Sequence, residues 1–434
     1  MKIKDTESLC FKCDKRLKAE IIEEGNKVYL KRMCIEHGEN KTLLSTDARY
    51  YRGLMRFYDT LAHKRIKQSR YILLLTDKCN MECPICFYDD KSIAAMAVSD
   101  IDKIKEIIPN SELILFGREP TCKTDLPEII KTLKKYQKNI SLYTNGVLIL
   151  TDGYLDILIK SGVTKIYLQF DGFSDDCYKD FRNKDLALQK RLILDKLRKK
   201  NMPTVLNMTI MRGINDIYIK DLVEYVANNT FIKGLNLIAY AHTGRGKDNF
   251  VQKSIMPDEV VDLLESQTQG LVNKRSVYLF QKLVYVYKLI FGQRHCPYLQ
   301  YFWLVRQKSG YVSIDKYLNL ESLGKVFDRY LDIHRSNRIA AGIYLFFVLP
   351  RHLLSYKTFC LAGEFLAVIV ADLFKKPYVN VPESRLFQLV FNTACDCYNA
   401  DFTIAANCHV GVIYKNQNDK LEILENDGLY LLRH

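Results

Sequence analysis

The sequence predicts an α/β protein built around a partial (β/α)6 barrel of the TIM type, with a small N-terminal metal-binding domain and an α+β C-terminal domain. Six short runs rich in β-forming residues lie between Tyr71 and Tyr240, and helical patterns separate them. Two of these patterns carry helix-start signals, since Ser99 precedes Asp102 by three residues and Pro127 lies near the start of the next helix. Repeated strand–helix–strand units imply a parallel sheet, and six units do not complete an eight-stranded barrel.

Functional side chains and glycines lie at or near the ends of the six predicted strands. Active sites of such barrels are found at the carboxyl ends of the strands, where the loops carry them. We therefore expect one face of the barrel to be the active site. In chain order the candidates are Cys79, Cys83 and Cys86, Gly117 and Glu119, Asn145, Gln169 and Asp171, Asn207, and Arg245.

The chain has 434 residues, of which 48% are hydrophobic, and this is enough for two or three domains. We predict a rubredoxin-like or zinc-ribbon-like metal-binding domain at residues 1–66, the partial barrel at 67–250, and a C-terminal domain for substrate or an auxiliary cluster at 251–434. The N-terminus has no apolar signal segment, and Glu364 and Asp372 interrupt the apolar runs near the other end. We therefore expect a cytoplasmic protein.

Charge and cysteine content restrict the partners. Without a secretion signal, the 13 cysteines indicate metal-bound thiolates more than disulfides. The net charge of +14 favours an anionic partner, but the lysines are scattered along the chain. We expect an anionic membrane surface and no nucleic acid, which would place the protein peripherally at the inner membrane surface.

Two pairs of metal-ligand residues precede the predicted barrel. Cys10 and Cys13 form a C-x2-C pair, and Cys34 and His37 form a C-x2-H pair after twenty intervening residues. A β-hairpin with its turn at Gly25 would bring the two pairs together. Four such ligands suit a tetrahedral ion, either zinc or a single rubredoxin-type iron. The alternative is a small hairpin with incidental cysteines.

Three cysteines follow the first predicted strand with the spacing C-x3-C-x2-C, at Cys79, Cys83 and Cys86. A 4Fe-4S cluster held by three thiolates keeps one iron open to a small molecule. This motif resembles the radical S-adenosylmethionine (SAM) superfamily over residues 71–245 at least. The resemblance implies SAM on the open iron, a 5'-deoxyadenosyl radical that removes a hydrogen atom from substrate, and a low-potential electron donor of the ferredoxin or flavodoxin type. The alternative is a structural metal loop or buried cysteines.

The resemblance also implies cofactor contacts. The segment "GREP" resembles the Gly-Gly-Glu-Pro motif of the superfamily, so Gly117 and Glu119 are expected at the amino group of the cofactor, although Arg118 replaces the second glycine. Ile85 replaces an aromatic residue that often packs near the adenine. Ribose and methionyl contacts are expected from four polar residues, which are also common strand-end caps or turn formers. They are Asn145, Gln169, Asp171 and Asn207, and Arg245 is expected to bind the cofactor as well.

Further cysteines lie in the C-terminal half, at Cys296, Cys360, Cys395, Cys397 and Cys408. They are compatible with an auxiliary 4Fe-4S cluster and equally with buried free cysteines. The motif order from "CFKC" to "DCYNADFTIAANC" resembles the branch that contains the archaeal tetraether lipid synthase and its bacterial relatives, some of which are labelled pterin methyltransferases. In that branch a proline occupies the position of Cys397. The branch also has a cysteine shortly after the position of Cys408, and this sequence lacks it.

Three functions remain as hypotheses. The first is hydrogen abstraction from a lipid chain to form a carbon–carbon bond, which the resemblance, the aromatic and aliphatic C-terminal half and the positive charge favour. The second is methylation or rearrangement of a pterin, peptide or other small molecule, because a fold of this class does not determine its substrate. The third is a non-catalytic, basic metal-binding module.

Overall fold

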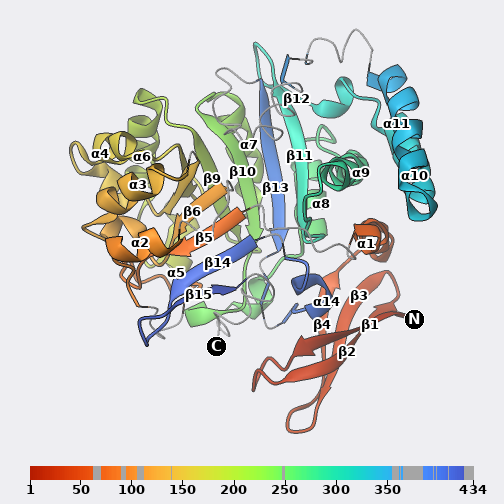
Figure 1. Ribbon diagram of the computed structural model, residues 1–434, viewed down its shortest axis with the longest axis horizontal. Coiled ribbons are helices and arrows are strands. Elements are labelled where there is room, and N and C mark those ends of the chain that lie inside the picture. The colour runs from red at the N-terminus through yellow and green to blue at the C-terminus, as the bar shows by residue number, and fades with distance from the viewer. Residues whose placement is uncertain are drawn as a thin grey trace.

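The computed structural model describes residues 1–61, 70–88, 94–104, 112–137, 139–246, 250–353, 361, 363–364, 385–393, 395–396, 398–408 and 410–424. Within these ranges the strands form a four-stranded sheet and an eleven-stranded sheet (Figure 1). The small sheet projects from one side of the molecule, and α1 and α14 lie between it and the remainder (Figure 1).

The small sheet is an antiparallel meander formed by the N-terminal residues. Its strands are β1 (Lys2–Leu9), β2 (Arg16–Glu24), β3 (Lys27–Cys34) and β4 (Gly38–Ser45). Two residues connect β2 to β3, and Gly25 has a φ of 59°, which is the conformation that a tight hairpin turn needs. The predicted hairpin is therefore confirmed. Alternation along these strands buries Ile21, Val28 and Leu30 on one face.

The six predicted barrel strands are all present and parallel. They are β5 (Arg70–Leu74), β6 (Glu112–Phe116), β7 (Ile140–Thr144), β8 (Lys165–Gln169), β9 (Thr204–Ile210) and β10 (Ile232–Ala239). They are neighbours in chain order, each pairing in parallel with the next. The fold class is thus confirmed as an α/β partial barrel.

The C-terminal half extends this sheet at both edges. β13 (Leu386–Thr393) pairs in parallel with β10, and β14 (Val410–Lys415) pairs in parallel with β5. Antiparallel β11 (Leu299–Arg306), β12 (Tyr311–Ser313) and β15 (Leu421–Leu424) complete the sheet beyond them. The sheet therefore continues across the domain boundary that the sequence predicts at residue 250.

Helices cover the sheet and link its strands. Those of the barrel are α2 (Val98–Ile104), α3 (Leu126–Lys134), α4 (Tyr154–Ser161), α5 (Asp176–Arg182), α6 (Ala187–Lys199) and α7 (Ile219–Ala227). Within the described residues the other helices are α1 (Ala48–Leu61), α8 (Pro257–Gln267), α9 (Lys274–Ile290), α10 (Leu320–Ser336), α11 (Arg338–Leu353) and α14 (Phe402–Ala405). Short 3-10 helices are η1 (Pro120–Cys122), η2 (Val147–Leu150), η3 (Asp216–Tyr218), η4 (Gly244–Gly246), η5 (Val251–Lys253) and η6 (Ile314–Lys316).

The predicted helix starts are correct at one position and shifted at the other. α3 begins with Pro127 in its first turn, as expected. α2 begins at Val98, so Ser99 lies inside it, and the carboxylate of Asp100 accepts the hydrogen bond of the Ala97 amide at 2.9 Å. Among the described helices, none combines the length and the apolar content needed to span a bilayer.

The two faces of the barrel sheet differ in character. Leucines such as Leu115, Leu142 and Leu168 alternate toward the helices and are fully buried in the main core. The other face carries polar and aromatic side chains. There the rings of Tyr143 and Tyr167 stack with centroids 4.5 Å apart, so the interior of the barrel is aromatic and hydrogen-bonded.

Candidate functional site

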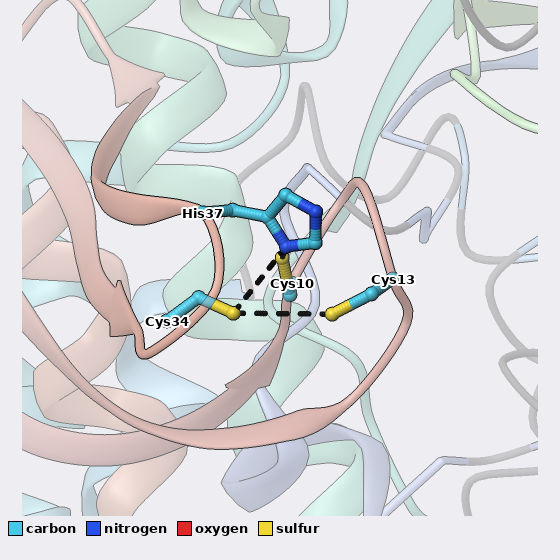
Figure 2. Close-up of side chains that lie close together, drawn as sticks. All are labelled: Cys10, Cys13, Cys34 and His37. Atoms are coloured by element: carbon cyan, nitrogen blue, oxygen red, sulfur yellow. Dashed lines mark hydrogen bonds between the residues drawn. The ribbon is translucent and has the colours of Figure 1, made fainter.

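The four predicted ligands of the N-terminal metal site converge in the structure. Cys10, Cys13, Cys34 and His37 come from the two loops at one end of the small sheet, and their ligand atoms all lie within 4.8 Å of one another (Figure 2). The Nδ1 atom of His37 is 3.5 Å from the Cys34 sulfur and 3.6 Å from the Cys10 sulfur. The sulfurs of Cys13 and Cys34 are 3.9 Å apart. The predicted grouping is therefore present.

These separations fit a tetrahedral metal ion. With bonds of about 2.3 Å to sulfur and about 2.0 Å to nitrogen, tetrahedral ligands lie about 3.8 Å apart for two sulfurs and about 3.5 Å apart for sulfur and nitrogen. A hydrogen bond with His37 also lowers the pKa of the Cys34 thiol, which favours the thiolate that a metal requires. The residues present thus fit a closed structural site.

The C-terminal segment before and within α14 anchors the small sheet. Buried Asp401 accepts hydrogen bonds from the Thr6 hydroxyl at 2.5 Å and from the Thr403 amide at 3.0 Å, and it forms an ion pair with Lys4 at 2.8 Å. The rings of Phe11 and Tyr398 stack with centroids 4.9 Å apart. The metal-binding end of the sheet is therefore held by residues almost four hundred positions away.

The loop with the three barrel cysteines follows β5 and is pinned by backbone contacts. The amide of Glu119 donates to the Lys78 carbonyl at 3.0 Å, just before Cys79. The amide of Arg245 donates to the Cys86 carbonyl at 3.1 Å at the other end of the loop. A Cβ atom on Gly244 would lie 2.4 Å from that same carbonyl oxygen, so only glycine allows this approach. Two strand-end segments predicted for the active site thus hold the cysteine loop.

The environment of the three thiols suits a cluster with three protein ligands. Burial raises the pKa of Cys79 to about 12 and raises that of Cys86, so a thiolate at either position needs a bound cation to stabilise it. The Arg182 guanidinium lies near Cys83 and interacts with it electrostatically. The ligands of a cluster bind separate irons, so these sulfurs need not converge as tightly as those around the single ion. The residues present therefore fit a 4Fe-4S cluster.

The buried carboxylate of Glu119 accepts hydrogen bonds from the ends of two strands. One carboxylate oxygen accepts hydrogen bonds from the Thr121 amide and hydroxyl and from the Thr144 hydroxyl, at 3.1, 2.6 and 2.7 Å. The other accepts from the Asn145 amide at 2.7 Å. Burial raises the pKa of Glu119 while these hydrogen bonds oppose the shift. The carboxylate joins the ends of β6 and β7, and its contact with the cofactor stays a prediction.

Asn145 and Gln169 are held by a lysine that the sequence did not reveal. The buried side-chain nitrogen of Lys190 lies 2.7 Å from the carbonyl oxygens of Asn145 and Gln169 and 2.6 Å from the Gln169 side-chain oxygen. The Asn145 side chain donates to Asn80, between the first two cysteines, at 2.7 Å. Lys190 lies on amphipathic α6, where a lysine is normally solvated, so no local signal distinguishes it.

The remaining polar candidates also lie together. Asp171 accepts two hydrogen bonds from Arg182, at 2.8 and 3.2 Å, and one from the Thr209 amide at 3.0 Å. Burial lowers the pKa of the Arg182 guanidinium, but the neighbouring Asp171 carboxylate raises it by more, so the pKa is raised overall. The Oδ1 atom of Asn207 accepts from Asn236 at 2.7 Å, whereas its buried Nδ2 has no partner within the described residues. Asn207 thus offers a donor toward the barrel interior.

Two further positions complete the comparison with the predicted contacts. Gly117 has a φ of 140°, and a Cβ there would lie 2.7 Å from the Thr76 carbonyl oxygen. A glycine at this position therefore allows the two backbone segments to pack closely. Ile85 packs with Phe181, Met211 and Tyr240 in a small apolar cluster beside the cysteine loop. An aliphatic surface therefore occupies the position where the superfamily often has a ring.

The structure describes three of the five C-terminal cysteines that the sequence singles out, namely Cys296, Cys395 and Cys408. Burial raises the pKa of Cys296 well above its ordinary value, and the nearby thiols of Cys395 and Cys408 add to this shift. These three sulfurs are therefore close enough to interact. Cys360 and Cys397 lie outside the described residues. The sequence also missed Cys122, whose pKa is raised by burial and by the nearby Glu119 carboxylate, and lowered by the Asn80 backbone next to Cys79.

A cavity of about 680 Å³ separates the small sheet from the ends of the barrel strands. His37 and Phe11 line it from the metal-binding loops, and Tyr240 lines it beside the apolar cluster that contains Ile85. The remaining walls contain both aromatic rings and hydrogen-bonding groups. Among them are Tyr50, Tyr51, His242, Tyr298, Gln300, Asp396, Tyr398 and Asn399.

Comparison with known proteins agrees with this geometry. Residues 73–226 match the model of the Radical SAM superfamily, and residues 2–46 match the HMPTM N-terminal zinc ribbon domain. The 7,8-dihydro-6-hydroxymethylpterin dimethyltransferase of Methanocaldococcus jannaschii is 31% identical over 307 residues, 63% of this chain and 61% of that protein. A probable GTP 3',8-cyclase of Pyrococcus abyssi is 30% identical over 156 residues, 35% of this chain and 50% of that protein. The chain thus spans less than two thirds of either relative.

Solved structures resemble the chain more distantly. Streptococcus suis SuiB bound to S-adenosylmethionine has a TM-score of 0.39 and 16% identity, over 52% of this chain and 51% of that one. Methylornithine synthase has a TM-score of 0.39 and 13% identity, over 51% and 68%. The zinc-ribbon match favours zinc over iron at the N-terminal site, and the superfamily match favours an enzyme over a non-catalytic module. The barrel of residues 73–226, with its three-cysteine loop, is thus a radical SAM domain.

Proposed function

We propose that the chain activates a C–H bond of a substrate held in the cavity between the zinc ribbon and the barrel. When bound, a 4Fe-4S cluster and SAM supply the radical that removes the hydrogen atom. Cys79, Cys83 and Cys86 would hold the cluster and leave one iron open for SAM. The observation that supports this placement is that Tyr240 lines the cavity and also packs against Ile85, one residue before the last cysteine.

The residues around the loop would orient the cofactor by fixing the strand ends. Lys190 and Glu119 hold the loop after β7, and Asn145 extends from it to the cysteine loop. Asn207 presents a buried donor without a described partner, which suits a hydroxyl or carboxylate of the cofactor. Because these groups are fixed before binding, little reorganisation is needed when the cofactor enters.

The walls of the cavity favour a planar, polar substrate. Aromatic rings such as Tyr240 and Tyr398 offer stacking surfaces, and Asp396, Asn399 and Gln300 offer hydrogen bonds in the same space. We propose a reduced pterin or a similar heterocycle as the substrate, because the Methanocaldococcus jannaschii relative is named as a pterin dimethyltransferase. A low-potential ferredoxin or flavodoxin remains the proposed electron donor.

The test uses the full chain, reconstituted anaerobically with iron and sulfide and supplied with SAM and a reductant. Addition of a reduced pterin deuterated at its reactive carbons should increase 5'-deoxyadenosine formation and place deuterium in that product. Tyr398→Ala should raise the KM for the pterin about tenfold, because a stacking surface is lost. Tyr136→Ala is the matched control, since this partly exposed tyrosine bonds to Asp102 far from the cavity. If no pterin alters 5'-deoxyadenosine formation, this substrate class is wrong.

A lipid chain is the second candidate substrate, and one observation favours it. The outer face of α11 exposes several large apolar side chains at the edge of the molecule, as a protein that meets lipid would require. Under this candidate, deuterium would pass from a labelled alkyl chain into 5'-deoxyadenosine and not from a labelled pterin. The resemblance to the lipid-coupling branch stays a prediction until that transfer is measured.

An auxiliary cluster is a further part of the proposal. Cys395 and Cys408 lie near enough to Cys296 to influence its pKa, and Cys395 directly precedes Asp396, which lines the cavity. Iron analysis of the native chain and of Cys296→Ala distinguishes an auxiliary cluster from buried free cysteines. A loss of about four irons on substitution would support a second 4Fe-4S cluster, whereas unchanged iron would identify Cys296 as a buried free thiol.

A further inference from the structure

The helix α11 lies at the edge of the molecule, paired with α10 (Figure 1). A single residue, Asn337, connects the two helices, and its side chain accepts hydrogen bonds from the Ile339 and Ala340 amides, both at 3.0 Å. This short connection fixes α11 against α10 as an antiparallel hairpin. One side of α11 therefore faces the protein and the other faces outward.

The inward side of α11 is packed as expected. Ala341 and Leu345 are buried, and Tyr344, Val348 and Leu349 pack against the main hydrophobic core. The His352 ring shares a hydrogen bond of 2.9 Å with the Ser322 hydroxyl on α10. These contacts fix the inward side of α11 on the protein.

The outward side is apolar as well, which is unusual for an exposed helix. Ile339, Ile343, Phe346 and Phe347 are 77%, 55%, 75% and 65% exposed. Their spacing of four, three and one residues places them on one stripe, about 12 Å long at 1.5 Å per residue. A helix that is apolar on all sides is normally buried in a protein or in lipid. This stripe requires a partner that accepts aliphatic and aromatic side chains.

Charge indicates which partner this is. Exposed Arg338 and Arg351 lie near the two ends of the stripe, and the sequence of α11 has no acidic residue. Within the described residues neither arginine has an ion-pair partner. A second copy of the chain, paired antiparallel on the same stripe, would bring Arg338 close to Arg351 without a compensating carboxylate. An anionic lipid surface instead attracts both arginines and accepts the apolar side chains between them.

We infer that the outward face of α11 docks the protein on an anionic membrane surface, with the helix lying in the interface. Phe346 and Phe347 would enter the region between headgroups and acyl chains, while Arg338 and Arg351 contact headgroup phosphates. The inference goes beyond the proposed reaction and does not depend on it. It also differs from a transmembrane anchor, because the inward face of α11 remains packed on the protein.

The test is cosedimentation of the full chain with vesicles of phosphatidylcholine, alone or mixed with phosphatidylglycerol. Native protein should bind the mixed vesicles, and high salt should weaken the binding because the arginine contacts are screened. Phe346→Ser/Phe347→Ser should bind about tenfold more weakly, since two large apolar side chains are lost. The matched control is Leu188→Ser/Ile217→Ser, which removes two side chains that are 70% and 65% exposed elsewhere.

A second measurement reports the contact directly. The native chain has a single tryptophan, Trp303, and Phe347→Trp introduces a second one on the stripe. The fluorescence emission of the new tryptophan should shift to the blue when the mixed vesicles are added. Equal vesicle binding by the native chain and the phenylalanine double variant would overturn the inference. So would a concentration-dependent dimer that the double variant abolishes, because a second copy would then cover the stripe. Neither readout uses 5'-deoxyadenosine, so failure here is distinct from failure of the proposed function.

Discussion

The side-chain nitrogen of Lys190 lies 2.7 Å from the carbonyl oxygen of Asn145, with the lysine fully buried beneath the active face of the barrel. Three acceptors surround this one group, two of them carbonyl oxygens at strand ends. A lysine of α6 thus fixes the ends of β7 and β8 relative to each other. The geometry of the cofactor site depends on this buried group.

Lys190→Met should lower the free energy of unfolding by about 3 kcal/mol, because the carbonyl oxygens of Asn145 and Gln169 would remain buried without a donor. Lys199→Met, at the exposed end of the same helix, is the control and should change the stability by less than about 0.5 kcal/mol. Denaturant unfolding under reducing conditions measures both. Equal stability of the two variants would contradict the role of Lys190.

The pH dependence provides a separate test of the same residue. Burial lowers the pKa of Lys190 to about 7 in the folded chain, below the ordinary value of 10.5. Between these values the unfolded chain binds more protons, so the stability contributed by Lys190 rises with pH from about 7 to about 10. The difference in unfolding free energy between native chain and Lys190→Met should therefore increase over this window. A flat difference would show that the lysine is charged in the fold.

Alanine substitution of Cys79, Cys83 or Cys86 should remove the radical SAM cluster. The iron content should fall by roughly four per chain and 5'-deoxyadenosine formation should fall to background, because two thiolates do not hold the site. Cys177→Ala is the control, since this buried thiol packs against the loop without belonging to the motif. Iron analysis, visible absorbance and product chromatography measure the outcome. Normal SAM cleavage in a loop variant would refute the assignment.

Removal of the ribbon metal should destabilise the small sheet selectively. His37→Ala or treatment with a chelator should release about one zinc per chain and increase hydrogen exchange in β1–β4, because the four ligands close two loops through the ion. The barrel strands should keep their protection. Zinc analysis combined with hydrogen exchange separates this result from global unfolding, and retention of zinc by His37→Ala would show that the fourth ligand is another group.

Asp401→Ala should loosen the ribbon from the rest of the protein. The substitution leaves Lys4 and the Thr6 hydroxyl without their buried acceptor, and loss of such a pair costs about 3 kcal/mol. Asp419→Ala, an exposed carboxylate in the β14–β15 turn, is the control. Limited proteolysis between α1 and the ribbon should accelerate only in Asp401→Ala. Identical cleavage rates would mean that other contacts dominate the docking.

Sequence patterns correctly predicted the N-terminal hairpin with its metal ligands and the strands of the barrel, because short stretches of sequence determine these features. The ligand pairs at Cys10 and Cys34 and the turn at Gly25 are correct because spacing and turn chemistry fix a hairpin. The barrel strands are correct because alternation of strand and helix repeats along the chain. Lys190 and Asp401 were not predicted as site or docking residues. Lys190 contacts Asn145, which is 45 residues away in the sequence, and Asp401 contacts Thr6, which is 395 residues away. No local sequence pattern encodes contacts over such separations.

The two edges of the barrel have a consequence for how the chain is made. Strands β5 to β10 are complete once residue 239 has been synthesised, yet their outer neighbours β13 and β14 begin only at Leu386 and Val410. Until those residues leave the ribosome, β5 and β10 each present an unpaired edge that can join another chain. A transcript interrupted between these points would yield an aggregation-prone product, and nascent chains of this protein should require a chaperone that shields strand edges throughout that interval.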